Sequence, residues 1–328
     1  MQRKHLIRLS YLLSLLLLMG ACKEEEYAIP TLSSDFQNTA IKRNLGPNLI
    51  GKNMEFAYAM ALPQVKGKIL SAQVEASIPG APGTYLDNQS YHTNLSRVDV
   101  GVIVGEPSVT EGNKSRVAFT ADTCAATLRY YYVVPEAARG QKVTFTFSAI
   151  SSTGENVSYS MGPYDVSRMD MVLDLNVKDG ENSYISIADM AVYDETAAAA
   201  NPGNIDLVYL YREMPSVTFA HSLVSPAADP QYLPSVALPA GVNKSTRLRK
   251  AWGLRDQQLA RLQFGIFIDD LDFQQLDLSD APNYGINMKA ESGAWVETAD
   301  GKYRAYIFVN AVDNTNKSAR ISIKRYAL

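Results

Sequence analysis

Residues 54–60 read MEFAYAM, and this stretch decides the fold class. Large apolar side chains stand at every second position, at Met54, Phe56, Tyr58 and Met60, with small or charged residues between them. This period of two is typical of a β-strand that has one buried face. The stretch therefore predicts a strand packed against a hydrophobic core.

Similar patterns continue towards the C-terminus. Turn clusters such as PGAPG at 79–83 and SSTGE at 151–155 separate the predicted strands. About seven short strands within some 120 residues favour an immunoglobulin-like sandwich. The strands of this first part are expected at residues 54–60, 68–76, 97–104, 115–120, 126–134, 141–148 and 156–161.

The second half predicts another β-domain. It closes with a hairpin, in which residues 303–309 and 319–325 flank the turn DNTN. One short helix is predicted at residues 252–263, because Trp252, Leu259 and Leu262 fall near one helical face, and 197–200 adds a helical turn. The other strands are expected at residues 171–177, 183–187, 206–211, 265–268 and 295–298.

The predicted fold class is therefore all-β with two sandwiches, the first immunoglobulin-like and the second jelly-roll-like with one short helix. The polar stretch around residues 165–170 separates them. We expect a signal peptide at residues 1–21, an acidic tether at 22–47, the first sandwich at 48–168 and the second at 169–328.

The N-terminus predicts export and lipidation. A basic start precedes about thirteen mostly apolar residues, fewer than the roughly 20 that cross a bilayer as a helix. Gly20 and Ala21 lead into Cys22, which resembles the lipobox of bacterial lipoproteins, although Met19 stands where leucine is usual. The resemblance implies a covalent diacylglycerol and acyl chain on Cys22 and no other cofactor.

An acidic run follows this cysteine directly. Lys23, Glu24, Glu25 and Glu26 resemble the surface-export signal of lipoproteins in Bacteroides-like bacteria. That resemblance implies a protein anchored in the outer membrane and facing the cell exterior. The alternative is a solvated tether without a sorting role.

The folded part is similar to an uncharacterised family of Bacteroides-type surface lipoproteins. The similarity rests on residues 48–60, 74–85, 183–193 and 205–211. It implies an accessory of nutrient uptake, encoded beside a TonB-dependent transporter and its capture lipoprotein, and some members carry a lipid-binding label. It supplies no catalytic residues.

Composition excludes several function classes. The net charge is −3 although three basic residues lie within the signal peptide, which argues against nucleic acid as a partner. Beyond the signal peptide the chain has His92, His221, Cys22 and Cys124, too few for a zinc ribbon or a histidine cluster, and no metal site is expected. Serine-hydrolase, zinc-protease and Walker motifs do not occur, so no catalytic residues and no enzymatic activity are predicted.

One acidic segment is the densest candidate for chemistry. It contains Asp269, Asp270 and Asp272 and continues to Asp280, but its spacing matches no EF-hand. A solvated loop after the predicted strand at 265–268 is the favoured interpretation. A hydrolase that uses paired carboxylates stays open as an alternative.

Tyrosine is abundant, with 19 residues against two tryptophans. Exposed tyrosines suit the binding of glycans or peptides, because their rings stack and their hydroxyls form hydrogen bonds. Tyr131 lies between two tyrosines and must face the opposite side of its strand, while Tyr91 and His92 fall in a polar loop. These three residues are the predicted ligand contacts, whereas Trp252 and Trp295 are expected in the core.

The leading hypothesis is a non-catalytic surface lipoprotein that binds a glycan or peptide and assists its uptake. A lipid ligand is an alternative within the same class. A structural or adhesive envelope component is the alternative from another class, and an exposed strand edge or hydrophobic groove favours it.

Overall fold

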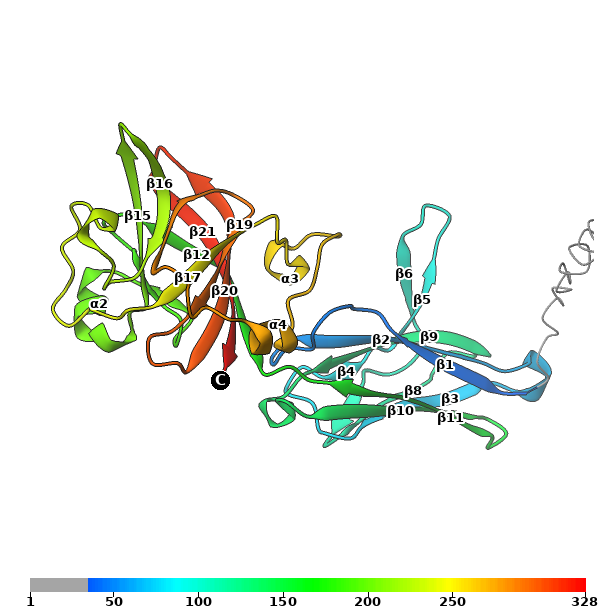
Figure 1. Cartoon of the computed structure of the whole chain (residues 1–328). Helices are drawn as coiled ribbons and strands as arrows, with labels where there is room; N and C mark the ends of the chain where they lie inside the picture. The colour runs from blue at the N-terminus through cyan, green and yellow to red at the C-terminus, as the bar shows by residue number, and fades with distance from the viewer. Residues whose placement is uncertain (1–34) are drawn as a thin grey trace, which may run out of the picture. The chain divides into compact units, whose positions relative to one another are not determined.

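The fold is all-β, as predicted, and consists of two sandwiches that follow one another along the chain (Figure 1). The computed structural model describes residues 35–328, and Phe36–Leu328 form one compact unit. The predicted signal peptide, Cys22 and the acidic run Lys23-Glu24-Glu25-Glu26 lie outside the described residues.

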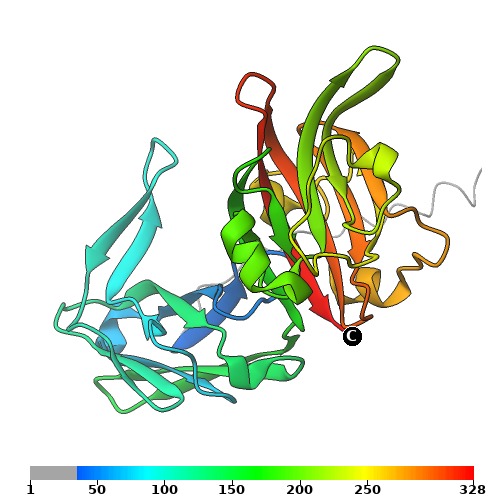
Figure 2. The ribbon, with the colours of Figure 1, turned by 90° about the vertical axis from the view of Figure 1, so that its left-hand side faces the viewer.

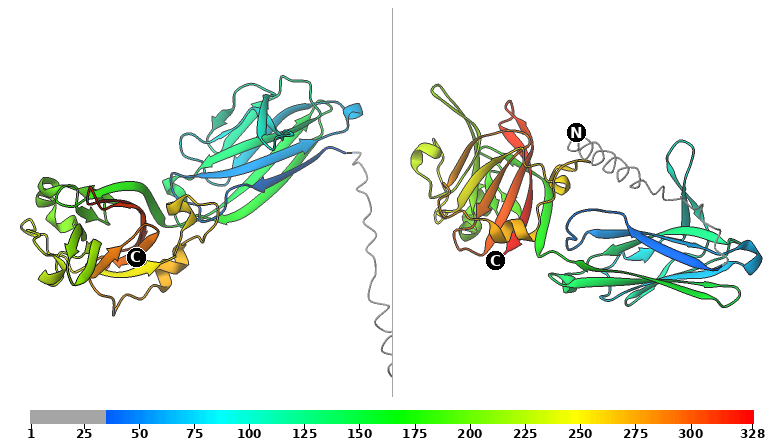
Figure 3. Two further views of the ribbon diagram at one scale, coloured as in Figure 1. Left: turned by 90° about the horizontal axis from the view of Figure 1, so that it is seen from above. Right: turned by 45° about the vertical axis from the view of Figure 1, so that its right-hand side comes forward.

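The first sandwich packs two antiparallel sheets face to face, as the right-hand view of Figure 3 shows. The sheet that we call the front sheet has the order β1-β2-β9-β4, and the other has the order β11-β10-β3-β8-β7. Its strands are β1 (Gln37–Lys42), β2 (Asn53–Ala61), β3 (Ile69–Ala76), β4 (Tyr85–Leu86), β7 (Val109–Glu111), β8 (Lys114–Ala118), β9 (Ala125–Val133), β10 (Lys142–Ser151) and β11 (Asn156–Asp165), with 3-10 turns η1 (Gln64–Lys66) and η2 (Glu136–Ala138).

Aromatic side chains fill the space between these two sheets. The alternation in MEFAYAM holds, because Met54, Phe56, Tyr58 and Met60 are all buried on one face of β2. Phe56 lies 4.7 Å from the ring of Phe145 on the facing sheet. Contacts of this kind between aromatic rings join the two sheets into one core.

A two-stranded ribbon projects from the first sandwich. It consists of β5 (Gln89–Thr93) and β6 (Asp99–Ile103), which pair only with each other. Figure 1 shows the ribbon rising beside β2 and β9 of the front sheet. The prediction of a loop at Tyr91 and His92 is wrong, because both residues lie in β5.

The second sandwich also has two antiparallel sheets, with the orders β12-β21-β20-β19-β17 and β14-β13-β15-β16-β18. Figure 2 shows that the β15–β16 and β20–β21 hairpins extend at the same end. Its strands are β12 (Met169–Lys178), β13 (Tyr184–Ser186), β14 (Ala191–Tyr193), β15 (Leu207–Met214), β16 (Val217–Val224), β17 (Arg247–Trp252), β18 (Tyr284–Met288), β19 (Ser292–Glu297), β20 (Tyr303–Asp313) and β21 (Ser318–Ala327). Short helices are α2 (Glu195–Ala200), η3 (Pro202–Asn204), η4 (Pro230–Tyr232), α3 (Gln257–Ala260) and α4 (Asp270–Gln275).

The segment that carries α3 and α4 covers the outer face of the sheet with the order β12-β21-β20-β19-β17. Leu259, Ile268 and Phe273 from this segment pack against Tyr306 and Phe308 of β20. Beneath them the fully buried Lys324 ammonium forms an ion pair with the fully buried Asp256 carboxylate, with 2.6 Å between Nζ and Oδ2. This covering layer therefore encloses charged groups as well as apolar ones.

Two local predictions in this half are wrong. Residues 252–263 do not form one helix, because Trp252 pairs with Ser292 in the β17–β19 ladder and α3 has only four residues. Residues 265–268 form no strand, since Ile266 makes only an isolated bridge and the Ile268 N–H donates to the Asp256 carboxylate. The helical turn at 197–200 and the C-terminal hairpin are confirmed.

Candidate functional site

The structure brings two of the three predicted ligand contacts to the front sheet. Tyr130 and Tyr132 are buried in the core, and Tyr131 therefore lies on the outer face of β9. Tyr91 lies on β5 of the ribbon, and its ring covers the guanidinium of Arg129, which is two residues before Tyr131. His92 follows Tyr91 on the same strand, so its side chain takes the opposite face of the ribbon and is exposed.

A stacked pair of tyrosines forms the exposed part of this site. Tyr85 of β4 lies directly opposite Tyr131 of β9, with ring centroids 5.0 Å apart and an angle of 22° between the ring planes. The side chain of Tyr85 is 41% exposed. We call Tyr85, Tyr91, Arg129 and Tyr131 the tyrosine face.

Arg129 anchors the ribbon to the front sheet. Its guanidinium carbon lies 3.8 Å from the centroid of the Tyr91 ring, and it forms an ion pair with Asp99 at the start of β6. Arg43 approaches the same carboxylate of Asp99 at 3.7 Å. These contacts hold both strands of the ribbon against the sheet, so the aromatic rings are positioned before any ligand arrives.

The hydroxyl of Tyr91 is also fixed. It donates a hydrogen bond of 2.7 Å to the buried carboxylate of Asp87. Burial and this bond to a carboxylate raise the pKa of Tyr91 to about 12. The phenol therefore stays protonated at neutral pH. Its hydrogen bond to Asp87 and the contact of its ring with Arg129 together fix the orientation of the ring.

An open groove of about 440 Å³ lies on the same side of the front sheet. Its floor is made of small side chains from three strands, and Ser90 of the ribbon lines it as well. Side chains of this size leave the backbone close to the surface, so a flat or extended ligand has room beside the ribbon. The floor residues are Thr39, Ala59, Ala61, Ala125 and Thr127.

Sequence reasoning missed Tyr85 and Arg129. Tyr85 stands in a strand of only two residues, too short to give a periodic signal. Arg129 lies two residues before Tyr131 on β9, so the two side chains share the outer face of the strand. This period of two could have predicted the outward direction of Arg129. Nothing local indicated that the ribbon would fold back onto this arginine.

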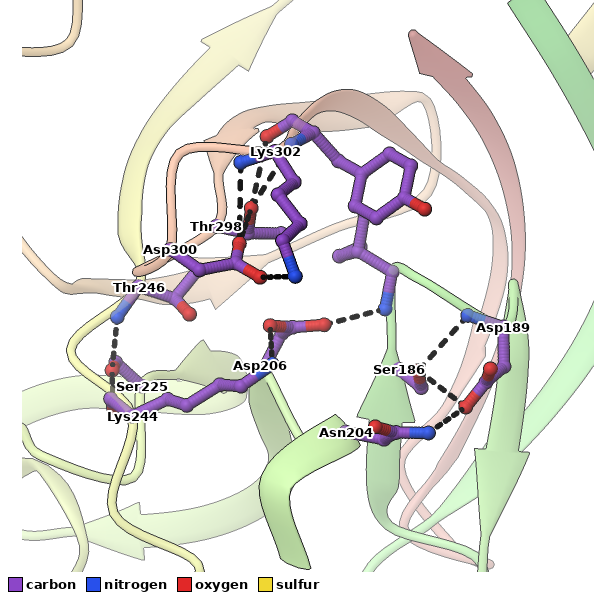
Figure 4. Close-up of polar contacts among 12 residues, drawn as sticks. Ser186, Asp189, Asn204, Asp206, Ser225, Lys244, Thr246, Thr298, Asp300 and Lys302 are labelled. Atoms are coloured by element: carbon purple, nitrogen blue, oxygen red, sulfur yellow. Dashed lines mark hydrogen bonds and ion pairs between the residues drawn. The ribbon is translucent and has the colours of Figure 1, made fainter. Parts of the chain in front are cut away.

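A second polar cluster, in the second sandwich, is structural in character (Figure 4). The Asp206 carboxylate is fully buried, accepts a hydrogen bond from the Ile187 N–H at 2.8 Å and pairs with Lys244 at 2.9 Å. Burial raises the pKa of Asp206, although Lys244 and the amide oppose that shift. Asp300 bonds instead with Thr298 within its own turn. These contacts connect the segments around Ile187, Asp206 and Lys244. The Asp206 carboxylate therefore has no solvent-exposed oxygen that could take part in hydrolysis.

The acidic segment at 269–280 has a local structural role rather than forming an open loop. Asp269 is the N-cap of α4 and forms a capping box with Asp272, while Asp270 accepts a hydrogen bond from the Arg168 N–H. Within residues 35–328, no group of three or more histidine, cysteine or acidic side chains is arranged to hold a metal ion. In that same part of the chain, none of the helices is both long enough and apolar enough to span a membrane.

Two family models match consecutive parts of the chain. Residues 33–166 match a domain of unknown function, DUF4466, and residues 167–328 match another, DUF8576. A comparison with curated proteins found no match.

Solved structures add a relative over nearly the whole folded part. The chain is 43% identical to a DUF4466 family protein from Parabacteroides merdae, with a TM-score of 0.84 over 90% of this chain and 99% of that chain. The major pilin subunit BcpA of Bacillus cereus is 10% identical, with a TM-score of 0.28 over 88% of this chain and 66% of that chain, which is too distant to carry an argument. The Parabacteroides relative agrees with the predicted uncharacterised family of Bacteroides-type bacteria. The chain belongs to the DUF4466 family, a family of unknown function.

Proposed function

We propose that this protein is a non-catalytic ligand-binding lipoprotein of the outer membrane, which captures a glycan or peptide at the cell surface for uptake. The observation that carries the proposal is the tyrosine face, where the exposed Tyr85 stacks on the half-buried Tyr131 beside a fixed Tyr91–Arg129 pair. Preformed aromatic surfaces of this kind suit sugar rings and peptide side chains.

The anchoring and delivery parts of the proposal rest on the sequence. The lipobox-like Cys22 and the acidic residues after it support attachment to the outer membrane and an outward orientation. A TonB-dependent transporter with its capture lipoprotein is the proposed partner.

A binding screen tests the proposal. The mature chain with Cys22→Ser, which cannot be acylated, is screened against polysaccharides, peptides and lipid vesicles by the shift in melting temperature. We expect a glycan or peptide to raise the melting temperature, and the double variant Tyr85→Ala/Tyr131→Ala to abolish that shift. Tyr159→Ala is the matched control, because Tyr159 is similarly exposed, at 39%, on the other sheet.

Two results would contradict the proposal. One is a response to lipid vesicles alone, which would favour the lipid-binding alternative. The other is a glycan or peptide response that survives loss of both tyrosines.

A structural or adhesive role is the second candidate, and the ribbon favours it. Leu95 and Val98 in the turn of the ribbon, and Val102 and Ile103 on β6, are exposed, although the ribbon pairs with no other strand. An unprotected apolar ribbon is a surface on which another chain can add. Under this alternative, Val98→Thr/Val102→Thr abolishes chemical cross-linking to envelope proteins but leaves the binding screen unchanged.

A further inference from the structure

The second sandwich contains an exposed tryptophan that the sequence analysis expected in the core. Trp252 ends the edge strand β17, and 56% of its surface is accessible. Trp295, by contrast, packs between the rings of Phe273 and Tyr306, 5.4 Å and 4.7 Å away. Trp252 therefore needs an explanation that core packing does not supply.

Lys250 holds the ring of Trp252 in place. Its ammonium nitrogen lies 4.0 Å from the ring centroid and also donates to the carbonyl oxygens of Ile286 and Asn287 on β18. A side chain bound at three points has little freedom to move, so one face of the indole is permanently supported. The entropy cost of fixing the ring has been met before a ligand binds, and the other face remains available for stacking.

Further charged groups lie close to this platform along the chain and its paired strand. Arg255 and Glu291 form an ion pair, and both side chains are about half exposed. Glu291 directly precedes Ser292, which pairs with Trp252 in the ladder between β17 and β19. Lys289 is exposed in the same turn, and its charge lowers the pKa of Lys250 in addition to the larger effect of burial. Three cationic groups and one carboxylate leave the surroundings of Trp252 with an excess of positive charge.

We propose that Trp252 is the stacking platform of a second binding site, which takes a ring of an acidic saccharide. The apolar face of the sugar lies on the open face of the indole, and its hydroxyls bond with Arg255 and Glu291. The carboxylate or sulfate of the ligand reduces the repulsion between Lys250 and Lys289. Cationic ligands are disfavoured, because they would meet those two lysines.

This site is independent of the tyrosine face, which lies in the other sandwich. The proposed function fails if Tyr85 and Tyr131 contact no ligand. The present inference fails if Trp252 does not contact an acidic saccharide, whatever binds to the tyrosine face.

The test titrates the mature Cys22→Ser chain with polygalacturonate, neutral dextran and a neutral strand-forming peptide, following tryptophan fluorescence and heat of binding. We expect a saturable response to polygalacturonate that weakens as salt increases. Trp252→Ala should lower the affinity at least tenfold, and Trp252→Tyr should recover part of it, because tyrosine retains a stacking ring. Lys250→Met should also weaken binding, since it removes both the ring support and a positive charge.

Tyr159→Ala is the matched control and should leave polygalacturonate binding unchanged. The titrations are repeated in the Tyr85→Ala/Tyr131→Ala background, which removes any contribution of the tyrosine face. Absence of a saturable response overturns the inference. In that background, dextran binding as tight as that of polygalacturonate, a response to the peptide alone, or unchanged polygalacturonate affinity after Trp252→Ala also overturns it.

Discussion

Replacing Asp256 by alanine should strongly destabilise the second sandwich. The Asp256 carboxylate accepts hydrogen bonds from Lys324 Nζ at 2.6 Å, the Ile268 N–H at 2.7 Å and the Leu259 N–H at 2.9 Å. Both charged side chains are fully buried, so the substitution leaves the Lys324 ammonium with only the Ile268 carbonyl oxygen at 2.9 Å. Breaking a buried pair from one side costs about 3–5 kcal/mol. That is a large part of the roughly 5–15 kcal/mol by which a domain is stable.

The two tryptophans provide the assay. Trp252 and Trp295 both lie in the second sandwich, and Trp295 contacts Phe273 of the covering segment. Urea unfolding followed by tryptophan fluorescence therefore reports this sandwich selectively, and the variant should lose about 3–5 kcal/mol of unfolding free energy at pH 7.

The pH dependence of the Asp256→Ala variant tests the cause. Burial lowers the pKa of Lys324 in the native protein. Removal of the Asp256 carboxylate takes away the largest interaction that opposes this shift and leaves only the weaker charges of Asp269 and Asp272. In the unfolded variant Lys324 keeps the ordinary lysine pKa, so between the two pKa values the unfolded chain binds more protons than the folded one. The unfolding free energy of the variant should therefore rise as the pH increases from 7 towards 10.

Lys324→Met is the partner control. The double variant Asp256→Ala/Lys324→Met should lose less stability than the sum of its two single variants, because no uncompensated charge stays buried. A loss below about 1 kcal/mol in Asp256→Ala, or a loss that does not change with pH, would refute the role assigned to this ion pair.

Three further predictions concern other parts of the chain. Burial lowers the pKa of His221, whose ring is hydrogen-bonded to Tyr209 and Asn314. The unfolding free energy should therefore decline as the pH falls from about 6.5, the ordinary histidine pKa, through that lower value. The variant His221→Gln should lack this decline. Phe145→Ala should cost the first sandwich about 3–5 kcal/mol, measured by circular dichroism in urea, because the Phe145 ring packs against Phe56 in the core. Cys22→Ser should abolish incorporation of labelled palmitate, and continued labelling would contradict acylation at this position.

The sequence by itself was sufficient for most individual strands. The alternation in residues 54–60 predicted β2 because one face of that strand is buried while the other is not, and the same applies to the C-terminal hairpin. It failed at residues 252–263, where Leu259 and Trp252 suggested one helix. There the ladder with β19 holds Trp252 in a strand, and this partner lies 40 residues away from it in the chain.

The sequence also indicated part of the candidate site. It predicted that Tyr131 faces away from its two neighbours, because that direction follows from the pleat of a single strand. It grouped His92 with Tyr91, although adjacent residues on a strand take opposite faces. The loop prediction for that segment concealed this separation.

What only the tertiary structure decided is which side chains meet. The stack of Tyr85 on Tyr131, the cover of Tyr91 over Arg129 and the support of Trp252 by Lys250 and β18 all depend on how separate segments pair or pack. Side-chain periodicity is a local property, since each residue's direction depends on its own strand. Pairing partners are selected by the free energy of the whole core, so no single segment of the sequence carries that information.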